Sequence, residues 1–171
     1  TDVGSVKTDI HEHIKAAGLE GQFIGGHPMA GSERTGYLNS KALLLENAYY
    51  ILTPTESVPK EKVELYRQLV LGMNAIPLIL SCDQHDYITA AVSHVPHVVS
   101  ASLVNLIKHS DSKEHLMWMI AAGGFKDITR ISSSSAVMWQ QICLTNRDNI
   151  VNLLDDYITE LKKIREQVSE G

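Results

Sequence analysis

The stretch from Ser81 to about Lys108 constrains the fold of this chain more than any other. Ser81 and Gln84 have the spacing of a capping box, which predicts that a helix begins there. Apolar residues then occupy nearly every side of this helix, as is typical of a helix in the middle of a bundle or in an interface. Pro96 removes one backbone donor and is expected to kink the helix.

The residues before this stretch have another pattern. Residues 6–17 have helical spacing, with Ser5 where an N-cap should lie and Gly18 where a C-terminal glycine should lie. The histidines of this helix, His11 and His13, are expected to be solvated. Residues 22–24 and 48–53 read as strands, so the first fifty-odd residues predict part of an α/β sheet.

The later segments are mostly helical in pattern. The sequence predicts an ordered loop over 125–135, because apolar residues flank its serine run. Gly123 and Gly124 are expected to end the helix before this loop. The last helix carries one apolar stripe among charges, as an interface helix does. The predicted helices span 58–73, 111–122, 137–144 and 146–168, with a short apolar connection or brief strand at 76–80.

Composition excludes several classes of function. The 171 residues carry a net charge of −5, which argues against a nucleic-acid partner, because such binding needs a basic face. Cys82 and Cys143 lie far apart without a pattern, as reduced thiols of a cytoplasmic protein do. His94, Pro96 and His97 interrupt the best apolar run, so we expect no membrane span.

The sequence Gly25-Gly26-His27-Pro28-Met29-Ala30-Gly31-Ser32-Glu33 follows the first predicted strand. Three glycines and a proline predict a stiff turn that presents His27 at the end of a strand, where open α/β sheets bind ligands. A tight turn with an incidental histidine is the alternative.

Two residue pairs in the helical part could carry chemistry. His94 and His97 are three residues apart and should share one helix face. They could be buried structural histidines, line a small-molecule pocket or, with further ligands that the spacing does not reveal, bind a metal. Asp127 and Arg130 are also three apart. Arg130 could grip a substrate carboxylate with its planar guanidinium, or simply pair with Asp127.

Four motifs occur in order along the chain: Thr1-Asp2-Val3-Gly4-Ser5-Val6-Lys7, the glycine-rich segment 25–33, His85-Asp86 with Ser93-His94-Val95-Pro96-His97, and Phe125-Lys126-Asp127-Ile128-Thr129-Arg130. Together they resemble the prephenate dehydrogenase family, and arogenate dehydrogenases share much of the pattern. The resemblance implies an oxidative decarboxylation of prephenate to 4-hydroxyphenylpyruvate, with hydride transfer to NAD or NADP. It implies that His27 takes the proton of the ring hydroxyl and that Ser5 helps to hold this hydroxyl beside the nicotinamide. Gly4 and Ser5 would also contact the cofactor.

The resemblance also implies substrate-binding residues in the helical part. Arg130 would clamp a substrate carboxylate, and His94 and His97 would line the pocket. Asp127 and Glu33 would form ion pairs near the site, and Gly123 would lie where the family senses tyrosine, the feedback inhibitor. No metal is implied.

The family's glycine fingerprint for the nucleotide does not occur in this chain. The expected fold is therefore mainly α: residues 1–55 as the C-terminal remnant of a Rossmann-type α/β domain, then residues 56–171 as an all-helical dimerisation domain. We expect a cytoplasmic homodimer and expect that the chain alone does not catalyse. The alternatives are an arogenate dehydrogenase, or a non-enzymatic helical dimerisation or ligand-sensing module.

Overall fold

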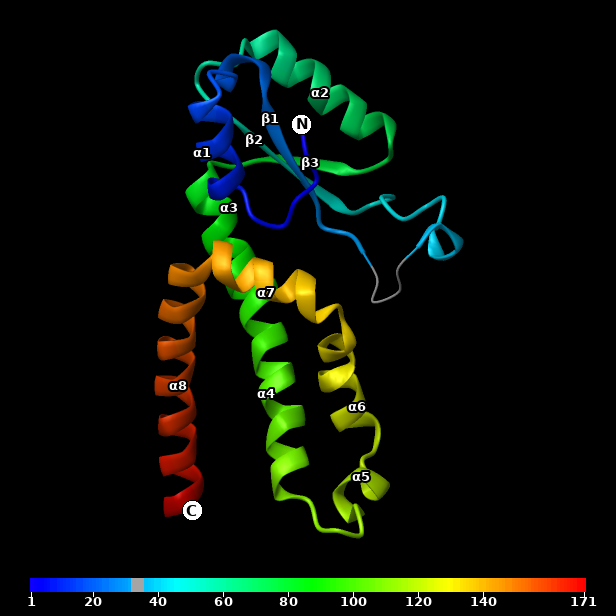
Figure 1. The fold of residues 1–171 in the computed structure, drawn as a ribbon, viewed down its shortest axis with the longest axis vertical. Coiled ribbons are helices and arrows are strands. Elements are labelled where there is room, and N and C mark those ends of the chain that lie inside the picture. Colours follow the sequence, from blue (N-terminus) through cyan, green and yellow to red (C-terminus); the bar gives the residue numbers. More distant parts are fainter. Residues whose placement is uncertain (32–35) are drawn as a thin grey trace. The chain divides into compact units, whose positions relative to one another are not determined.

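The computed structural model describes residues 1–31 and 36–171, which form two compact units (Figure 1). The first unit comprises Thr1–Thr89 and the second Ala90–Gly171. The sequence placed the boundary after residue 55. It lies later here because the next helix and strand pack on the sheet and complete its core.

The first unit is a small sheet with helices on it. Its elements are α1 (Thr8–Ala16), η1 (Glu20–Gln22), β1 (Ile24–Pro28), η2 (Tyr37–Asn39), β2 (Tyr49–Pro54), α2 (Lys60–Gly72), β3 (Ile76–Ile79) and α3 (Cys82–Thr89). The strand order is β1-β2-β3; β1 runs antiparallel to β2, with His27 opposite Ile51, and β3 runs parallel to β2.

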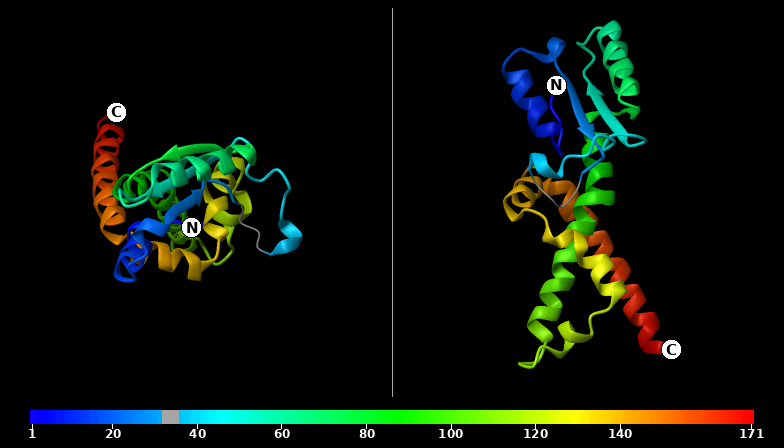
Figure 2. Two further views of the ribbon diagram at one scale, coloured as in Figure 1. Left: turned by 90° about the horizontal axis from the view of Figure 1, so that it is seen from above. Right: turned by 90° about the vertical axis from the view of Figure 1, so that its right-hand side faces the viewer.

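Alternation along the strands decides which side chains meet which helix. Ile24, Tyr50 and Leu52 form a core with Val70 of α2. Their neighbours in sequence must point to the opposite face, because successive side chains in a strand alternate. That face carries His27 and contacts α1 and α3. Figure 2 shows α1 and α2 on opposite sides of the sheet. The pleat of β1 thus fixes the side of the sheet on which His27 lies.

Residues 25–28 of the glycine-rich segment continue β1 and do not form the turn that the sequence predicted, and Ser32 and Glu33 lie outside the described residues. Neither Gly25 nor Gly26 has a positive φ. A Cβ at Gly25 would lie 2.2 Å from Thr53 Oγ1, and a Cβ at Gly26 would lie 2.7 Å from the Asp2 carbonyl oxygen. These glycines are therefore required by close packing and not by backbone freedom.

The second unit is entirely helical in the residues described. Its elements are η3, a π-helical segment (Ala90–His94), α4 (Val95–Ser110), α5 (Leu116–Ile120), α6 (Gly123–Thr129), η4 (Arg130–Ser133), α7 (Ala136–Thr145) and α8 (Arg147–Glu170). A buried cluster of Ala90, Val95 and Ile150 joins η3 and α4 to the start of α8, and α4 also contacts α6 and η4.

The predicted capping box is confirmed. Gln84 N donates to Ser81 Oγ (3.2 Å), and Ser81 N donates to Gln84 Oε1 (3.1 Å). The helix that begins there continues through α3, η3 and α4 to Ser110, with a π-turn just before Pro96. By length and composition alone this helix could span a membrane, which we did not expect. Core helices meet the same criterion, so this finding by itself assigns no membrane.

Three predictions in the second unit are wrong. Gly123 and Gly124 begin α6 instead of ending a helix, and residues 125–131 are helical instead of a loop. The helix expected from Asp111 starts only at Leu116, because the Asp111 carboxylate accepts the Met117 backbone N–H (2.9 Å). The serine run is ordered, as expected, since each hydroxyl of residues 132–134 donates to the carbonyl three residues before it.

Candidate functional site

His27 of β1 is the start of a chain of side chains in the first unit. The half-buried imidazole points away from α2 and towards α3. Its Nδ1 lies 2.7 Å from Nε2 of His85, and the two ring centroids are 5.0 Å apart. The strand and the helix thus bring together two histidines that are 58 residues apart in sequence.

His85 in turn contacts Asp86. The His85 ring is completely buried, and its Nδ1 lies 2.7 Å from Asp86 Oδ1. The Lys7 backbone N–H donates to the same oxygen, and the Thr8 backbone N–H donates to Oδ2, both at 2.8 Å. Asp86 therefore satisfies two of the N–H groups that the first turn of α1 leaves unpaired.

This environment keeps Asp86 ionised. Burial alone would raise the pKa of its carboxyl, but the hydrogen bonds from His85, Thr8 and Lys7 together hold that pKa below its usual value. Before the structure, His85 and Asp86 had no assigned role and were only part of the motif that carries the resemblance. A histidine and an aspartate side by side at the start of an apolar helix were the available signal.

An ion pair holds the strand beside His27. The Lys7 ammonium is fully buried, pairs with the Asp2 carboxylate, and donates to the Gly26 carbonyl (2.7 Å). Gly26 N donates in return to Asp2 Oδ1 (3.1 Å). Burial alone would raise the pKa of Asp2, but hydrogen bonds from Lys7, Gly26 and Gly4 lower it overall. Burial lowers the pKa of the Lys7 ammonium.

Gly4 and Ser5 lie in the segment that leads into α1. Gly4 N donates to Asp2 Oδ2 (2.7 Å), and a Cβ at Gly4 would lie 2.9 Å from that oxygen. Ser5 is half-buried. The prediction that Ser5 is the N-cap is wrong, because α1 begins at Thr8 and Asp86 supplies the capping oxygens. His11 is not solvated as predicted either, since its Nε2 lies 3.0 Å from Thr53 Oγ1.

His94 and His97 share one face of the helix, as their spacing predicted, and meet at Trp139 of α7. Trp139 stacks on His97 with centroids 3.5 Å apart and meets His94 edge-on at 6.0 Å. Asn146 Nδ2 lies 3.2 Å from His94 Nδ1. Trp139 was not among the predicted site residues, because nothing in its local spacing relates it to a helix some forty residues earlier.

The histidine and tryptophan of this stack keep unused polar atoms. Burial lowers the pKa of His97, and a hydrogen bond with the Ile131 backbone partly opposes that effect. Within ranges 1–31 and 36–171, His97 Nδ1 and Trp139 Nε1 are buried nitrogens without a hydrogen-bond partner. Such atoms usually meet a water or a ligand.

The other predicted residues of the second unit are exposed. Asp127 lies on α6, and Arg130 begins η4 three residues later. Gly123 begins α6, with open space around the position that a Cβ would take. Glu33 lies outside the described residues. In the described part of the chain, no group of three His, Cys, Asp or Glu side chains is arranged to hold a metal ion.

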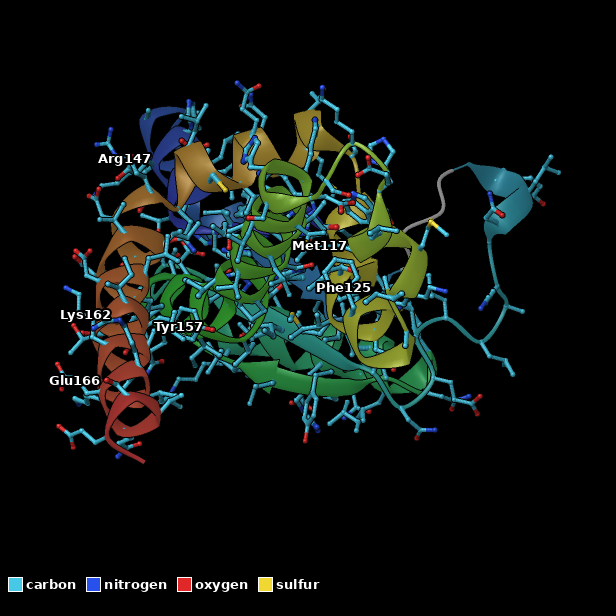
Figure 3. The ribbon with its side chains drawn as sticks, turned by 90° about the horizontal axis from the view of Figure 1, so that it is seen from below. Met117, Phe125, Arg147, Tyr157, Lys162 and Glu166 are labelled. Carbon is cyan, nitrogen blue, oxygen red and sulfur yellow. The ribbon has the colours of Figure 1, made fainter. Side chains whose placement is uncertain are left out.

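Two cavities lie elsewhere. One of about 480 Å³ is lined by Ile24, Val58 and Tyr66, on the α2 side of the sheet and thus away from His27. The other, of about 260 Å³, lies in the second unit and is lined by Ile107 and by Met117 and Phe125, which Figure 3 labels. Among the described residues, none of the predicted catalytic, substrate-binding or cofactor-binding residues lines either cavity.

Comparison with known proteins gives consistent matches along the whole chain. Residues 1–77 match the family model "Prephenate dehydrogenase, nucleotide-binding domain", and residues 81–171 match "Prephenate dehydrogenase, dimerization domain". The prephenate dehydrogenase of Bacillus subtilis (strain 168) is 45% identical over 171 residues, which are 99% of this chain and 46% of that protein. The chain thus spans about half the length of this curated relative.

Solved structures of prephenate and arogenate dehydrogenases also match this chain. The crystal structure of prephenate dehydrogenase from A. aeolicus in complex with hydroxyphenyl propionate and NAD+ matches with a TM-score of 0.91 at 33% identity, over 99% of this chain and 59% of that one. The arogenate dehydrogenase of Synechocystis matches with a TM-score of 0.84 at 30% identity, over 99% of this chain and 61% of that one.

Proposed function

The chain belongs to the prephenate dehydrogenase family, and from that premise we propose that it supplies the substrate-site residues of an NAD(P)-dependent prephenate dehydrogenase. The reaction is the oxidative decarboxylation of prephenate to 4-hydroxyphenylpyruvate. The observation that carries the proposal is the position of His27, which β1 presents as a half-buried imidazole anchored by a second histidine. The A. aeolicus relative, whose structure holds hydroxyphenyl propionate and NAD+, supports it.

His27 acts as the general base. As hydride leaves the ring carbon that bears the 4-hydroxyl, a carbonyl forms there and the hydroxyl proton must be removed. Imidazole suits this task, because its ordinary pKa lies near neutrality and it can accept a proton at the operating pH. Loss of the carboxylate as carbon dioxide then leaves its bonding electrons in the ring, which becomes aromatic, and the ring oxygen takes up a proton. The gain of aromaticity drives the reaction forward.

The Gly4–Ser5 turn is the part of the cofactor site that this chain supplies. Its geometry fits a flat ring, because the close contact with Asp2 admits no side chain at Gly4 and keeps the backbone bare. When bound, NAD or NADP accepts the hydride as an oxidant. The Ser5 hydroxyl would help to orient the substrate hydroxyl. On this proposal the sheet of the first unit is the C-terminal part of a Rossmann-type domain.

The second unit supplies groups that bind the substrate. Arg130 offers an exposed guanidinium, whose planar fork matches a carboxylate. His97 offers a buried Nδ1 with capacity for a polar ligand atom, beside His94 and Trp139. We assign charged supporting roles to Asp127 and Glu33. Gly123, with open space around it, is the proposed contact for tyrosine as a feedback inhibitor.

An arogenate dehydrogenase is the second candidate, favoured by the Synechocystis structure, which is named as one. Prephenate and arogenate differ in a keto or an amino group on the side chain, far from the hydroxyl that His27 deprotonates. The base chemistry is therefore common to both candidates. Comparing kcat/KM for the two substrates in the full-length protein decides between them.

We also propose a homodimer that acts in the cytoplasm. The family model for residues 81–171 describes a dimerization domain. Beyond Leu154, α8 exposes an apolar stripe of Tyr157, Leu161, Ile164 and Val168 that a second copy would cover. Figure 3 shows Lys162 and Glu166 on the outer side of the same helix. The free thiols of Cys82 and Cys143 suit a reducing compartment.

Replacing the base in the full-length protein tests the function. His27→Asn should lower kcat by about 10²- to 10⁴-fold, which is the usual worth of general base catalysis. His13→Asn is the matched control, because His13 is exposed on α1 and should leave kcat unchanged. In the same steady-state assay, Arg130→Ala should raise KM for prephenate. A His27→Asn enzyme that keeps kcat within about threefold would fit a ligand-sensing module instead of a dehydrogenase.

A further inference from the structure

We infer that His85 and Asp86 are positioning residues, which keep the proton of His27 on Nδ1 and thereby leave Nε2 as the atom that accepts the substrate proton. This inference rests on the proposed function of His27 as the base. It deepens that function, because an imidazole on a strand has two nitrogens and only one tautomer can take a proton at Nε2.

Two backbone N–H groups determine which atoms donate in the chain of hydrogen bonds from Asp86 to His27. The N–H groups of Lys7 and Thr8 can only donate, and both point at the Asp86 carboxylate. A carboxylate that accepts two such bonds in a buried position is ionised, and an ionised carboxylate can only accept. The 2.7 Å contact between Asp86 Oδ1 and His85 Nδ1 must therefore carry a proton on the histidine nitrogen.

The same reasoning determines the tautomers of the His85 and His27 rings. A neutral imidazole has one donor and one acceptor, so a proton on Nδ1 of His85 makes its Nε2 an acceptor. Nε2 of His85 lies 2.7 Å from Nδ1 of His27, which must then donate. The proton of the neutral His27 ring is thus held on Nδ1, and its Nε2 carries the lone pair that the base reaction needs.

The chain also stabilises the product of proton transfer. When Nε2 of His27 takes the proton, the ring becomes a cation that keeps its Nδ1–H bond to His85. That bond connects the cation, through the buried His85 ring, to the fixed negative charge of Asp86. Hydrogen bonds in a chain of this kind polarise one another more strongly inside a protein than in water.

Nitrogen-15 NMR on the full-length wild-type protein tests the tautomer directly. Long-range proton–nitrogen correlations of the imidazole rings distinguish Nδ1–H from Nε2–H, and His27→Asn and His85→Gln spectra assign the two rings. We expect both neutral rings in the Nδ1–H form. A neutral His27 with its proton on Nε2 would overturn the inference, whatever the enzyme's activity.

A matched pair of substitutions at His85 gives the kinetic test. Glutamine offers one donor and one acceptor at nearly the spacing of the two ring nitrogens, whereas leucine fills similar space with neither. His85→Leu should lower kcat by about 10²-fold or more, as loss of the correct tautomer does in other enzymes, with KM within about threefold. His85→Gln should recover most of this loss.

The two outcomes separate the inference from the function on which it rests. If His85→Leu and His85→Gln have the same kcat as the wild type while His27→Asn is inactive, His27 is the base and the positioning role is wrong. If His27→Asn is also fully active, the proposed function fails as well. Asp86 is left intact in this test, because it also holds the first turn of α1.

Discussion

Adding a single methyl group at Gly25 tests the packing that holds β1 in place. An ideal Cβ at this position would lie 2.2 Å from Thr53 Oγ1 and 2.8 Å from His11 Nε2. Thr53 is completely buried and directly opposite Gly25 in the strand register, so the two backbones cannot separate without breaking the ladder. We therefore expect Gly25→Ala to destabilise the first unit.

The structure sets the size of the effect. Overpacking a buried site costs about 1–3 kcal/mol. Thr53 Oγ1 can turn away only by leaving His11 Nε2, at 3.0 Å, and a lost hydrogen bond adds about 1 kcal/mol. The free energy of opening should thus fall by about 2–4 kcal/mol, which corresponds to a change of about 30- to 1,000-fold in the opening equilibrium.

Hydrogen exchange, read by mass spectrometry on peptides that cover β1 and β2, measures this change locally. Gly72→Ala is the control, because nothing lies within 4 Å of its added Cβ, and it should leave exchange unchanged or slow it. The double variant Gly25→Ala with Thr53→Ala should lose less than the sum of the two single variants. Exchange in Gly25→Ala that matches the Gly72→Ala protein would refute the reasoning.

Two further predictions concern charge and assembly. The pKa of Asp2 in the folded protein lies below the usual value of 3.8, so its contribution to stability is present above that value and is lost as the pH falls through the folded pKa. Between pH 6 and 3 the free energy of unfolding should fall less steeply for Asp2→Asn than for the wild type, and equal slopes in urea titrations would contradict the assignment. For assembly, light scattering of the full-length protein at micromolar concentration should show a dimer. Leu161→Glu should weaken it and its neighbour Lys162→Glu should not, whereas a wild-type monomer would exclude the proposed interface.

Local sequence patterns predicted helices and strands well where particular side chains favour one structure, as in a capping box or a run of β-branched and aromatic residues. The capping box at Ser81 begins the observed helix, and the β-branched and aromatic run at 48–53 matches β2 to within one residue at each end. The structural role of each glycine was harder to predict, because a residue without a side chain fits a turn, a helix start or a crowded strand equally well. Gly25 is explained by Thr53 and His11 alone, and neither lies near it in sequence. Gly123 opens a helix where the sequence suggested an end.

The candidate site could be predicted only in part. A spacing of three placed His94 and His97 on one face, and both rings do meet Trp139. Spacing could not connect His27 to His85, because the contact depends on which face of β1 is buried and on where α3 lies against the sheet. The same holds for Asp86, whose partners are backbone amides of α1 that any sequence would supply. The roles of Arg130, Asp127 and Gly123 remain predictions.

On the side of β1 that faces away from β2, side chains from the N-terminal segment bind the backbone of the strand. Met29 N donates to Tyr49 O. The backbone N–H and C=O groups of the odd-numbered residues of this strand therefore point towards β2, and those of the even-numbered residues point away from it. Lys7 and Asp2 occupy both outward groups of Gly26, and Pro28 has no N–H. These bonds hold the strand immediately beside His27, so replacing Lys7 or Asp2 would leave a Gly26 backbone group without its partner and loosen the geometry around His27.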